Sequence, residues 1–213
     1  MLPSRILHGL SLAAVVALSA CGSVSMVPQS ASPAYTSAYA VDDRAIGSHD
    51  LDVLTRSKQR GAFMMHFDRP ADEVFEFLLT RVDEYSESVV AVAFDHSSST
   101  TPGSFGVGSV RICTFDNGKV LREPLTVYEP HRYYAYTVDS ENSTFSIPLR
   151  DVLLFYSFEE RGTDGTLVTV RAHHTPKIWL ATPVITGAFN RDVAKTFAGA
   201  VEAFGGTLVQ PDA

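Results

Sequence analysis

The chain has 213 residues, of which 45% are hydrophobic, and it carries 24 acidic against 17 basic side chains, a formal net charge of −7. This length suffices for one domain with a buried core. The acidic balance, without any block of Lys and Arg, excludes the electrostatic footprint of a nucleic-acid-binding protein, so we expect no nucleic-acid partner.

The first twenty residues resemble a bacterial lipoprotein signal peptide. Arg5 precedes an apolar run that is too short to span a bilayer, and Leu18-Ser19-Ala20 stands directly before Cys21. In such signals the cysteine is lipidated and becomes the first residue of the mature chain. We therefore expect acyl chains on Cys21 to hold the protein in the cell envelope. Gly22 resembles the residue that directs Gram-negative lipoproteins to the periplasmic face of the outer membrane. The alternative is an ordinary secretory signal with an unmodified cysteine.

The region after Cys21 reads as a tether. Residues 22–40 are rich in Ser, Ala, Pro, Tyr and Val, with no periodicity and no charged side chain. We assign residues 1–20 to the signal peptide, 21–59 to a mostly unstructured tether, 60–206 to one folded domain and 207–213 to a C-terminal tail.

The folded domain is predicted to begin with a strand over Ala62–Phe67. A helix opens at Asp68-Arg69-Pro70, where proline and acidic residues suit the first turn, and a short helical piece follows around Asp83–Glu87. Short connections between the next six strand-like runs predict an antiparallel meander. These runs are Val89–Phe94, Gly108–Phe115, Val120–Val127, His131–Val138, Leu149–Phe158 and Leu167–His174.

A long amphipathic helix is predicted at the C-terminal end. Thr182 is placed as its N-cap and Pro183 as its first residue, apolar side chains recur every four residues from Ile185 to Val201, and Gly205-Gly206 ends it. Two internal glycines, Gly187 and Gly199, cost helix propensity. We expect them where the backbone approaches the sheet or leaves room above it.

This order of elements resembles the START-like helix-grip superfamily, also called SRPBCC, which includes bacterial polyketide cyclase/dehydrase proteins. The stretches that carry the resemblance are Phe67–Phe75, Gly106–Arg111, Glu123–Tyr136 and Gly165–Val170. The resemblance implies an α+β helix-grip fold, in which a curved antiparallel sheet of about seven strands wraps around the long C-terminal helix, with two short helices after the first strand. It also implies a cavity between sheet and helix for an apolar or amphipathic small molecule.

Strand parity selects the side chains that face this cavity, because alternate residues of a strand point to one face. The candidate ligand-binding residues are Arg111, Glu123, Tyr134, Tyr136, Tyr156 and Phe158, together with Phe189 of the last helix. The alternative is that these side chains fill a solid core. Cys113 shares the inward parity, and we expect it to be a buried thiol without a disulfide partner.

Arg111 and Glu123 are predicted to lie opposite each other. The strands that carry them are joined at Asp116-Asn117-Gly118, and folding back about this turn brings positions 111 and 123 together. A charge in an apolar interior is costly unless it is paired. The two side chains therefore either fasten the strands as an ion pair or orient a polar group of the ligand.

Evidence for catalysis or metal binding is sparse in the sequence. It contains no HExxH, nucleophile elbow, P-loop or cysteine pair, and His173 and His174 are adjacent on a strand and point to opposite faces. We expect neither a metal nor another cofactor, and no catalytic residue is assigned. The favoured hypothesis is an envelope-anchored protein that binds a hydrophobic or amphipathic small molecule. The alternative is a metal-independent aromatase/cyclase-type enzyme for a polyketide-like substrate, with Glu123 or a cavity tyrosine as acid and base.

Overall fold

The computed structural model describes residues 57–209. Cys21, the predicted signal peptide and most of the predicted tether lie outside the described residues. The described elements, in chain order, are β1 (Gln59–Phe67), α2 (Ala71–Thr80), α3 (Val82–Tyr85), β2 (Val89–Asp95), β3 (Val110–Phe115), β4 (Val120–Glu129), β5 (Tyr133–Thr137), β6 (Leu149–Glu160), η3 (Gly162–Asp164), β7 (Thr166–Pro176), η4 (Trp179–Ala181), α4 (Thr182–Phe204) and β8 (Gly206–Val209).

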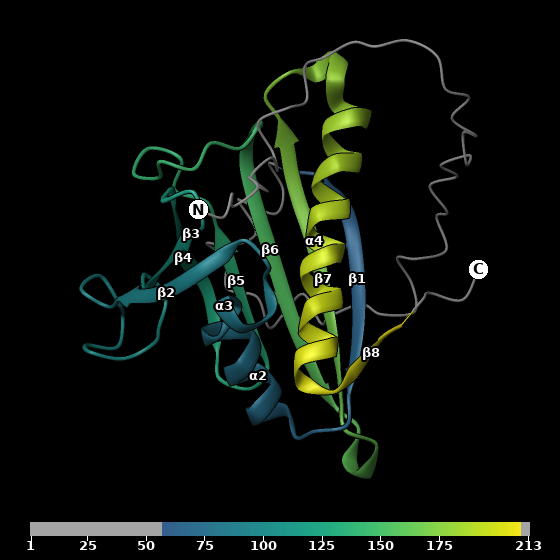
Figure 1. Ribbon diagram of the computed structural model, residues 1–213. Coiled ribbons are helices and arrows are strands. Elements are labelled where there is room, and N and C mark those ends of the chain that lie inside the picture. Colours follow the sequence, from purple (N-terminus) through teal and green to yellow (C-terminus); the bar gives the residue numbers. More distant parts are fainter. Residues whose placement is uncertain (1–56, 210–213) are drawn as a thin grey trace, which may run out of the picture. The chain divides into compact units, whose positions relative to one another are not determined.

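The strands form one antiparallel sheet with the order β2-β3-β4-β5-β6-β7-β1-β8 (Figure 1). Strands β2 to β7 are each the neighbour of the next, which confirms the predicted meander. The first strand, β1, pairs with β7, so the two strands that come first and last among β1 to β7 in the sequence are neighbours in the sheet. An eighth strand, Gly206–Val209, pairs with β1 and carries the fold into residues assigned above to the tail.

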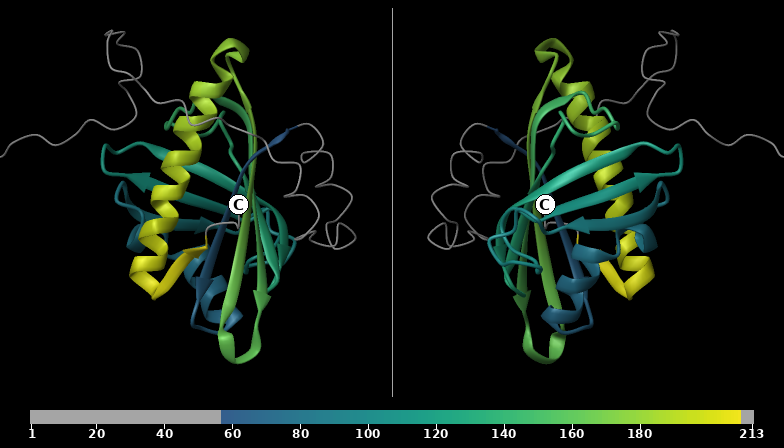
Figure 2. Two further views of the ribbon diagram at one scale, coloured as in Figure 1. Left: turned by 90° about the vertical axis from the view of Figure 1, so that its right-hand side faces the viewer. Right: turned by 90° about the vertical axis from the view of Figure 1, so that its left-hand side faces the viewer.

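The sheet curves, and α4 crosses its concave face (Figure 2). The helix lies against β1, β7 and β8 and also against α3. Strands β2 to β4 bend away from the rest of the sheet and form the second wall around the helix (Figures 1 and 2). This arrangement is the helix-grip fold that the order of the elements predicted.

The beginning of α4 differs from the prediction. The N-cap is Ala181, and Thr182 is already helical, with φ −48° and ψ −48°. The reason is the 3₁₀ turn η4, which runs directly into the helix. The Thr182 hydroxyl donates a hydrogen bond of 2.7 Å back to the carbonyl oxygen of Trp179. At the other end Gly205 adopts the left-handed conformation, with φ 77°, and ends the helix as predicted.

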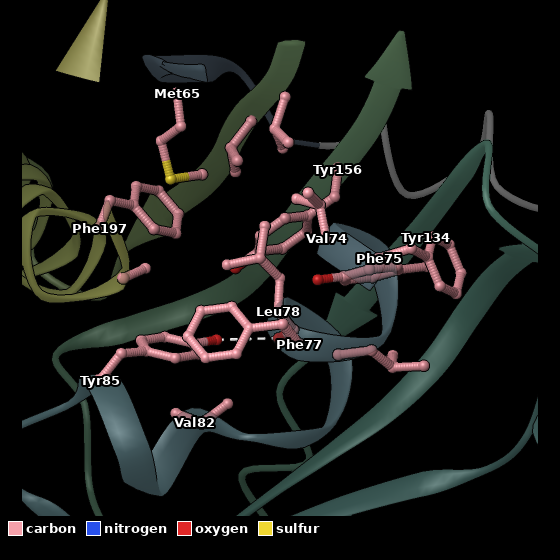
Figure 3. Close-up of a cluster of buried hydrophobic side chains, with 14 of the residues drawn as sticks. Met65, Val74, Phe75, Phe77, Leu78, Val82, Tyr85, Tyr134, Tyr156 and Phe197 are labelled. Atoms are coloured by element: carbon pink, nitrogen blue, oxygen red, sulfur yellow. Dashed lines mark hydrogen bonds between the residues drawn. The ribbon is translucent and has the colours of Figure 1, made fainter. Parts of the chain in front are cut away.

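The main core lies between α2, the C-terminal half of α4 and the concave face of the sheet (Figure 3). Phe75 of α2 is at its centre, with ring centroids 5.2 Å from Tyr134 and 5.0 Å from Phe158. From α4, the ring of Phe197 packs 6.0 Å from Tyr156. A smaller cluster on the opposite face of β4 to β6 consists of Val127, Ala135, Leu153 and Phe155.

Candidate ligand-binding site

Arg111 and Glu123 form an ion pair inside the fold. They are directly opposite in the register of β3 and β4, and Arg111 Nε donates to Glu123 Oε2 over 2.9 Å. The residues are 4% and 7% exposed. The predicted pairing and inward orientation are therefore confirmed.

Other groups of the protein complete the environment of this pair. Arg111 Nη1 lies 3.5 Å from the Leu79 carbonyl oxygen, and its guanidinium carbon is 3.9 Å from the ring centroid of Tyr136. Burial acts to lower the pKa of Arg111, but Glu123 together with Tyr136, Cys113 and Tyr85 acts more strongly in the other direction, so the pKa is raised. The ion pair is thus held by contacts within the chain, and the Arg111 guanidinium remains charged.

Cys113 lies beside the carboxylate as a buried thiol. Its Sγ donates to Glu123 Oε2 over 3.5 Å. Burial, followed by the negative charge of Glu123, raises the pKa of Cys113 to about 12. The thiol therefore stays protonated near neutral pH and is not an activated nucleophile.

The four predicted aromatic residues of β5 and β6 come together on the concave face. The ring centroids of Tyr134 and Tyr156 are 4.5 Å apart, and those of Tyr134 and Phe158 are 5.6 Å apart. Tyr136 joins them, with its ring centroid 5.4 Å from that of Tyr134. All four are buried in the main core between α2 and the C-terminal half of α4, so in this part of the fold they fill a packed core.

The buried phenols have two chemical consequences. Burial raises the pKa of Tyr134, Tyr136 and Tyr156, which keeps them neutral. The Tyr134 hydroxyl is fully buried, and among the described residues it has no hydrogen-bond partner. A buried hydroxyl of this kind is rare and is available to a polar atom that reaches it.

Packing is less complete under the N-terminal half of α4. The only fully buried residues of this helix are Phe197 and Ala200, both in its C-terminal half. Nearer its start, Val193 and Phe189 are only partly buried, and so are apolar side chains of the sheet on the same concave side. We define the candidate site as the region bounded by Leu121 of β4, Leu154 of β6, and Phe189 and Val193 of α4, next to the Arg111–Glu123 pair.

Phe189 is thus separated from the other predicted ligand-binding aromatics. Its ring packs against His174 of β7, with centroids 4.8 Å apart, rather than against the tyrosines. Leu121 is the register partner of Cys113, so the apolar side of the candidate site begins two residue pairs from the ion pair, at the next pair on the same face. Alternation along the strands places Leu121 on the same face as Glu123 and Leu154 on the same face as Tyr156, but it gives no signal that the two leucines are less covered than the tyrosines.

His173 and His174 point to opposite faces of β7, as predicted. His173 Nδ1 lies 3.3 Å from the Ser57 carbonyl oxygen, whereas His174 faces α4, with Nε2 3.2 Å from Thr186 Oγ1. Within residues 57–209, no three His, Cys, Asp or Glu side chains are grouped so that they would hold a metal ion. None of the helices in this range is long and apolar enough to cross a membrane.

Burial of His174 should make stability depend on pH. Desolvation, followed by the charges of Arg60 and His173, lowers the pKa of His174 to about 4. Between pH 4 and the ordinary pKa of about 6.5, the unfolded chain binds more protons than the folded chain. Stability therefore falls as the pH falls through this window, and it levels off above it.

We expect acidification to lower the melting temperature of the wild type more than that of His174→Gln, measured by circular dichroism. The exposed control His131→Asn should follow the wild type. Equal acid sensitivity of all three proteins would contradict the assignment.

Comparison with known proteins supports the fold. No protein-family model matches the chain, and no curated protein matches its sequence. Among solved structures, an uncharacterized protein from Bacillus thuringiensis has a TM-score of 0.52 at 16% identity, covering 68% of this chain and 97% of its own. Protein XoxI from Bacillus cereus has a TM-score of 0.51 at 18% identity, covering 68% and 94%. The di-domain ARO/CYC protein BexL from the BE-7585A biosynthetic pathway has a TM-score of 0.48 at 16% identity, covering 76% and 55%. At 16% and 18% identity, the similarity to the two Bacillus proteins concerns the fold alone.

Proposed function

We propose that this chain is an envelope-anchored lipoprotein that binds a hydrophobic or amphipathic small molecule between the sheet and α4. The observation that carries the proposal is the partly buried apolar region under the N-terminal half of α4. In a protein without a ligand, inward apolar side chains at this position would normally be closed into the core. The core beneath α2 is closed in this way, so the incomplete burial is confined to the region of the candidate site.

The chemistry of the candidate site favours an amphipathic ligand. Leu121, Leu154 and Val193 would provide the apolar contacts, and the buried Arg111–Glu123 pair beside them would provide the polar ones. An apolar body with one polar group would satisfy both parts of this lining.

Binding can be tested with the fluorescent probe N-phenyl-1-naphthylamine. Val193→Phe adds bulk at a partly buried position of the candidate site and should weaken probe affinity about tenfold, which corresponds to about 1.4 kcal/mol. Val90→Phe is the matched control, because Val90 is 58% exposed on β2, outside the candidate site, and receives the same substitution. Native mass spectrometry of the wild type from its own host should also show retained cargo. Equal probe affinity in both variants would contradict the proposed site.

Anchoring has a separate test at Cys21. Metabolic labelling with a radioactive fatty acid should mark the wild type, and Cys21→Ala should abolish the label and block processing at that position. A wild-type protein that takes up no lipid label would rule out the anchor without affecting the proposal for the ligand site.

The enzyme alternative is less well supported by the contacts of its candidate groups. Glu123 Oε2 already accepts hydrogen bonds from Arg111 and Cys113, and the tyrosines have raised pKa values. A general base works best with a pKa near the operating pH and with its proton-accepting oxygen free for substrate. We therefore favour binding over acid–base catalysis.

A further inference from the structure

Four large apolar side chains at the start of α4 are exposed to solvent. Ile178 is 59% exposed, Trp179 76%, Leu180 73% and Val184 63%. We call this group the apolar tip. Three of these residues are consecutive, which distinguishes them from the single exposed apolar side chains that are common on protein surfaces.

The apolar tip is built on an ordered turn. The Ala181 amide donates to the Ile178 carbonyl oxygen over 3.2 Å, and the Thr182 hydroxyl donates to the Trp179 carbonyl oxygen over 2.7 Å. Lys177 is tied to the neighbouring loop by a hydrogen bond of 3.0 Å from its amide to the Pro148 carbonyl oxygen. These backbone groups are satisfied within the chain, so the turn can enter a less polar medium without leaving them unpaired.

The apolar tip lies at the end of the domain where the described chain begins. Gln59, the first residue of β1, pairs with His173 near the end of β7, and the His174 amide donates to the Lys58 carbonyl oxygen over 3.2 Å. The turn that follows β7 stands at the top of the fold, above the start of β1 (Figures 1 and 2). The segment that leads from Cys21 therefore joins the domain beside the apolar tip.

We propose that the apolar tip docks the domain onto a phospholipid bilayer by inserting Trp179 and its apolar neighbours into the interface. Tryptophan is enriched at membrane surfaces, where its ring lies at the level of the headgroups. Three exposed basic residues, Lys58, Arg150 and Lys177, are at the same end of the sheet, with Asp151 as an acidic neighbour. In a chain of net charge −7, this local excess of positive charge suits phosphate groups.

The predicted anchor would make a weak insertion effective. Thirty-five residues separate Cys21 from Ser57, and a chain of that length reaches at most roughly 120 Å. A domain held this close to the bilayer has a high effective concentration at its surface, so a small number of apolar side chains is enough to populate the docked state. This step rests on the proposed anchoring at Cys21, whereas the exposure of the apolar tip does not.

Docking would also orient the candidate site. The first turns of α4 carry the apolar tip, and Phe189 and Val193 follow on the same helix at the least buried part of the concave face. A domain docked by the apolar tip would present this part of the fold to the membrane. An amphipathic ligand would then pass between bilayer and protein over a short path.

Trp179 provides the test, because it is the only tryptophan of the chain. The full chain is combined with vesicles of phosphatidylcholine and phosphatidylglycerol in equal parts, and tryptophan emission is measured with and without brominated phosphatidylcholine. We expect a blue shift and strong quenching by the bromines. Leu180→Asp should abolish most of the quenching. Leu208→Asp is the matched control, because Leu208 is exposed on β8 away from the apolar tip, and it should leave the quenching unchanged.

The readout is the depth of Trp179, which is a different signal from attachment of the chain through Cys21. Acylation of Cys21 is measured in the same preparations. The lipid label tests the anchor, and the tryptophan emission tests docking by the apolar tip. Unchanged emission on addition of vesicles would overturn the docking proposal. A blue shift without vesicles that grows with protein concentration, together with a dimer in sedimentation velocity, would overturn it in favour of a second copy of the chain as the occupant.

Discussion

Glu123→Gln should lower the free energy of unfolding by about 3 kcal/mol, because it leaves the buried Arg111 guanidinium without its counter-charge. The substitution keeps the size and shape of the side chain, so the lost stability reports the charge. For a domain of this size, we expect the melting temperature to fall by about 6–12 °C. Urea unfolding followed by circular dichroism measures the free energy directly.

A control pair lies on the other face of the sheet and joins β2 to β4. Arg122 and Asp95 form an ion pair of 3.5 Å that is much more exposed, so Asp95→Asn should lower stability far less than Glu123→Gln does. Replacing both buried partners, in Arg111→Met with Glu123→Leu, should recover much of the lost stability. If Glu123→Gln costs no more than Asp95→Asn but weakens binding of N-phenyl-1-naphthylamine, the pair orients a ligand instead of fastening the strands.

The sequence was sufficient to predict the pairing of β3 and β4. The turn at Asp116-Asn117-Gly118 fixes the register, and the alternation of the strands then sets which side chains share a face. For this reason the opposition of Arg111 and Glu123 and the common face of Tyr134 and Tyr136 follow from local rules. The same reasoning gave the order of the meander, because its connections are short.

Features that depend on distant contacts could not be predicted from local patterns. The strand Gly206–Val209 is only four residues long, and it forms because β1 offers an edge beside the end of α4. The N-terminal boundary of α4 moved by one residue because the turn Trp179–Ala181 runs into the helix. Neither feature leaves a periodic signal in the sequence.

Burial within the candidate site was also beyond prediction. Strand parity treats all inward residues alike, yet Tyr134 is fully covered by α2 while Leu121 and Leu154 are only partly buried. The difference arises because α2 covers one part of the concave face and the N-terminal half of α4 covers another part less closely. Which helix lies over which strand is a property of the tertiary fold.

The two glycines inside α4 illustrate the same limit and give the second large prediction. The expectation was that each marks a close approach to the sheet or room above it. Gly199 instead marks a close approach to α3, because a Cβ atom there would collide with the Tyr85 carbonyl oxygen. Around Gly187, no atom of the described surroundings lies within 4 Å of the position that a Cβ atom would take.

The same substitution should therefore have opposite effects at these two positions of one helix. Gly199→Ala should destabilise the fold by about 2–3 kcal/mol, since a backbone carbonyl cannot yield as a flexible side chain does and α4 must move away from α3. Gly187→Ala should stabilise it by up to about 1 kcal/mol, through the better helix propensity of alanine. Chemical denaturation of both variants measures the two effects. Stabilisation by Gly199→Ala would show that α3 yields to the methyl group, and the contact between α3 and α4 would then not fix the position of the helix.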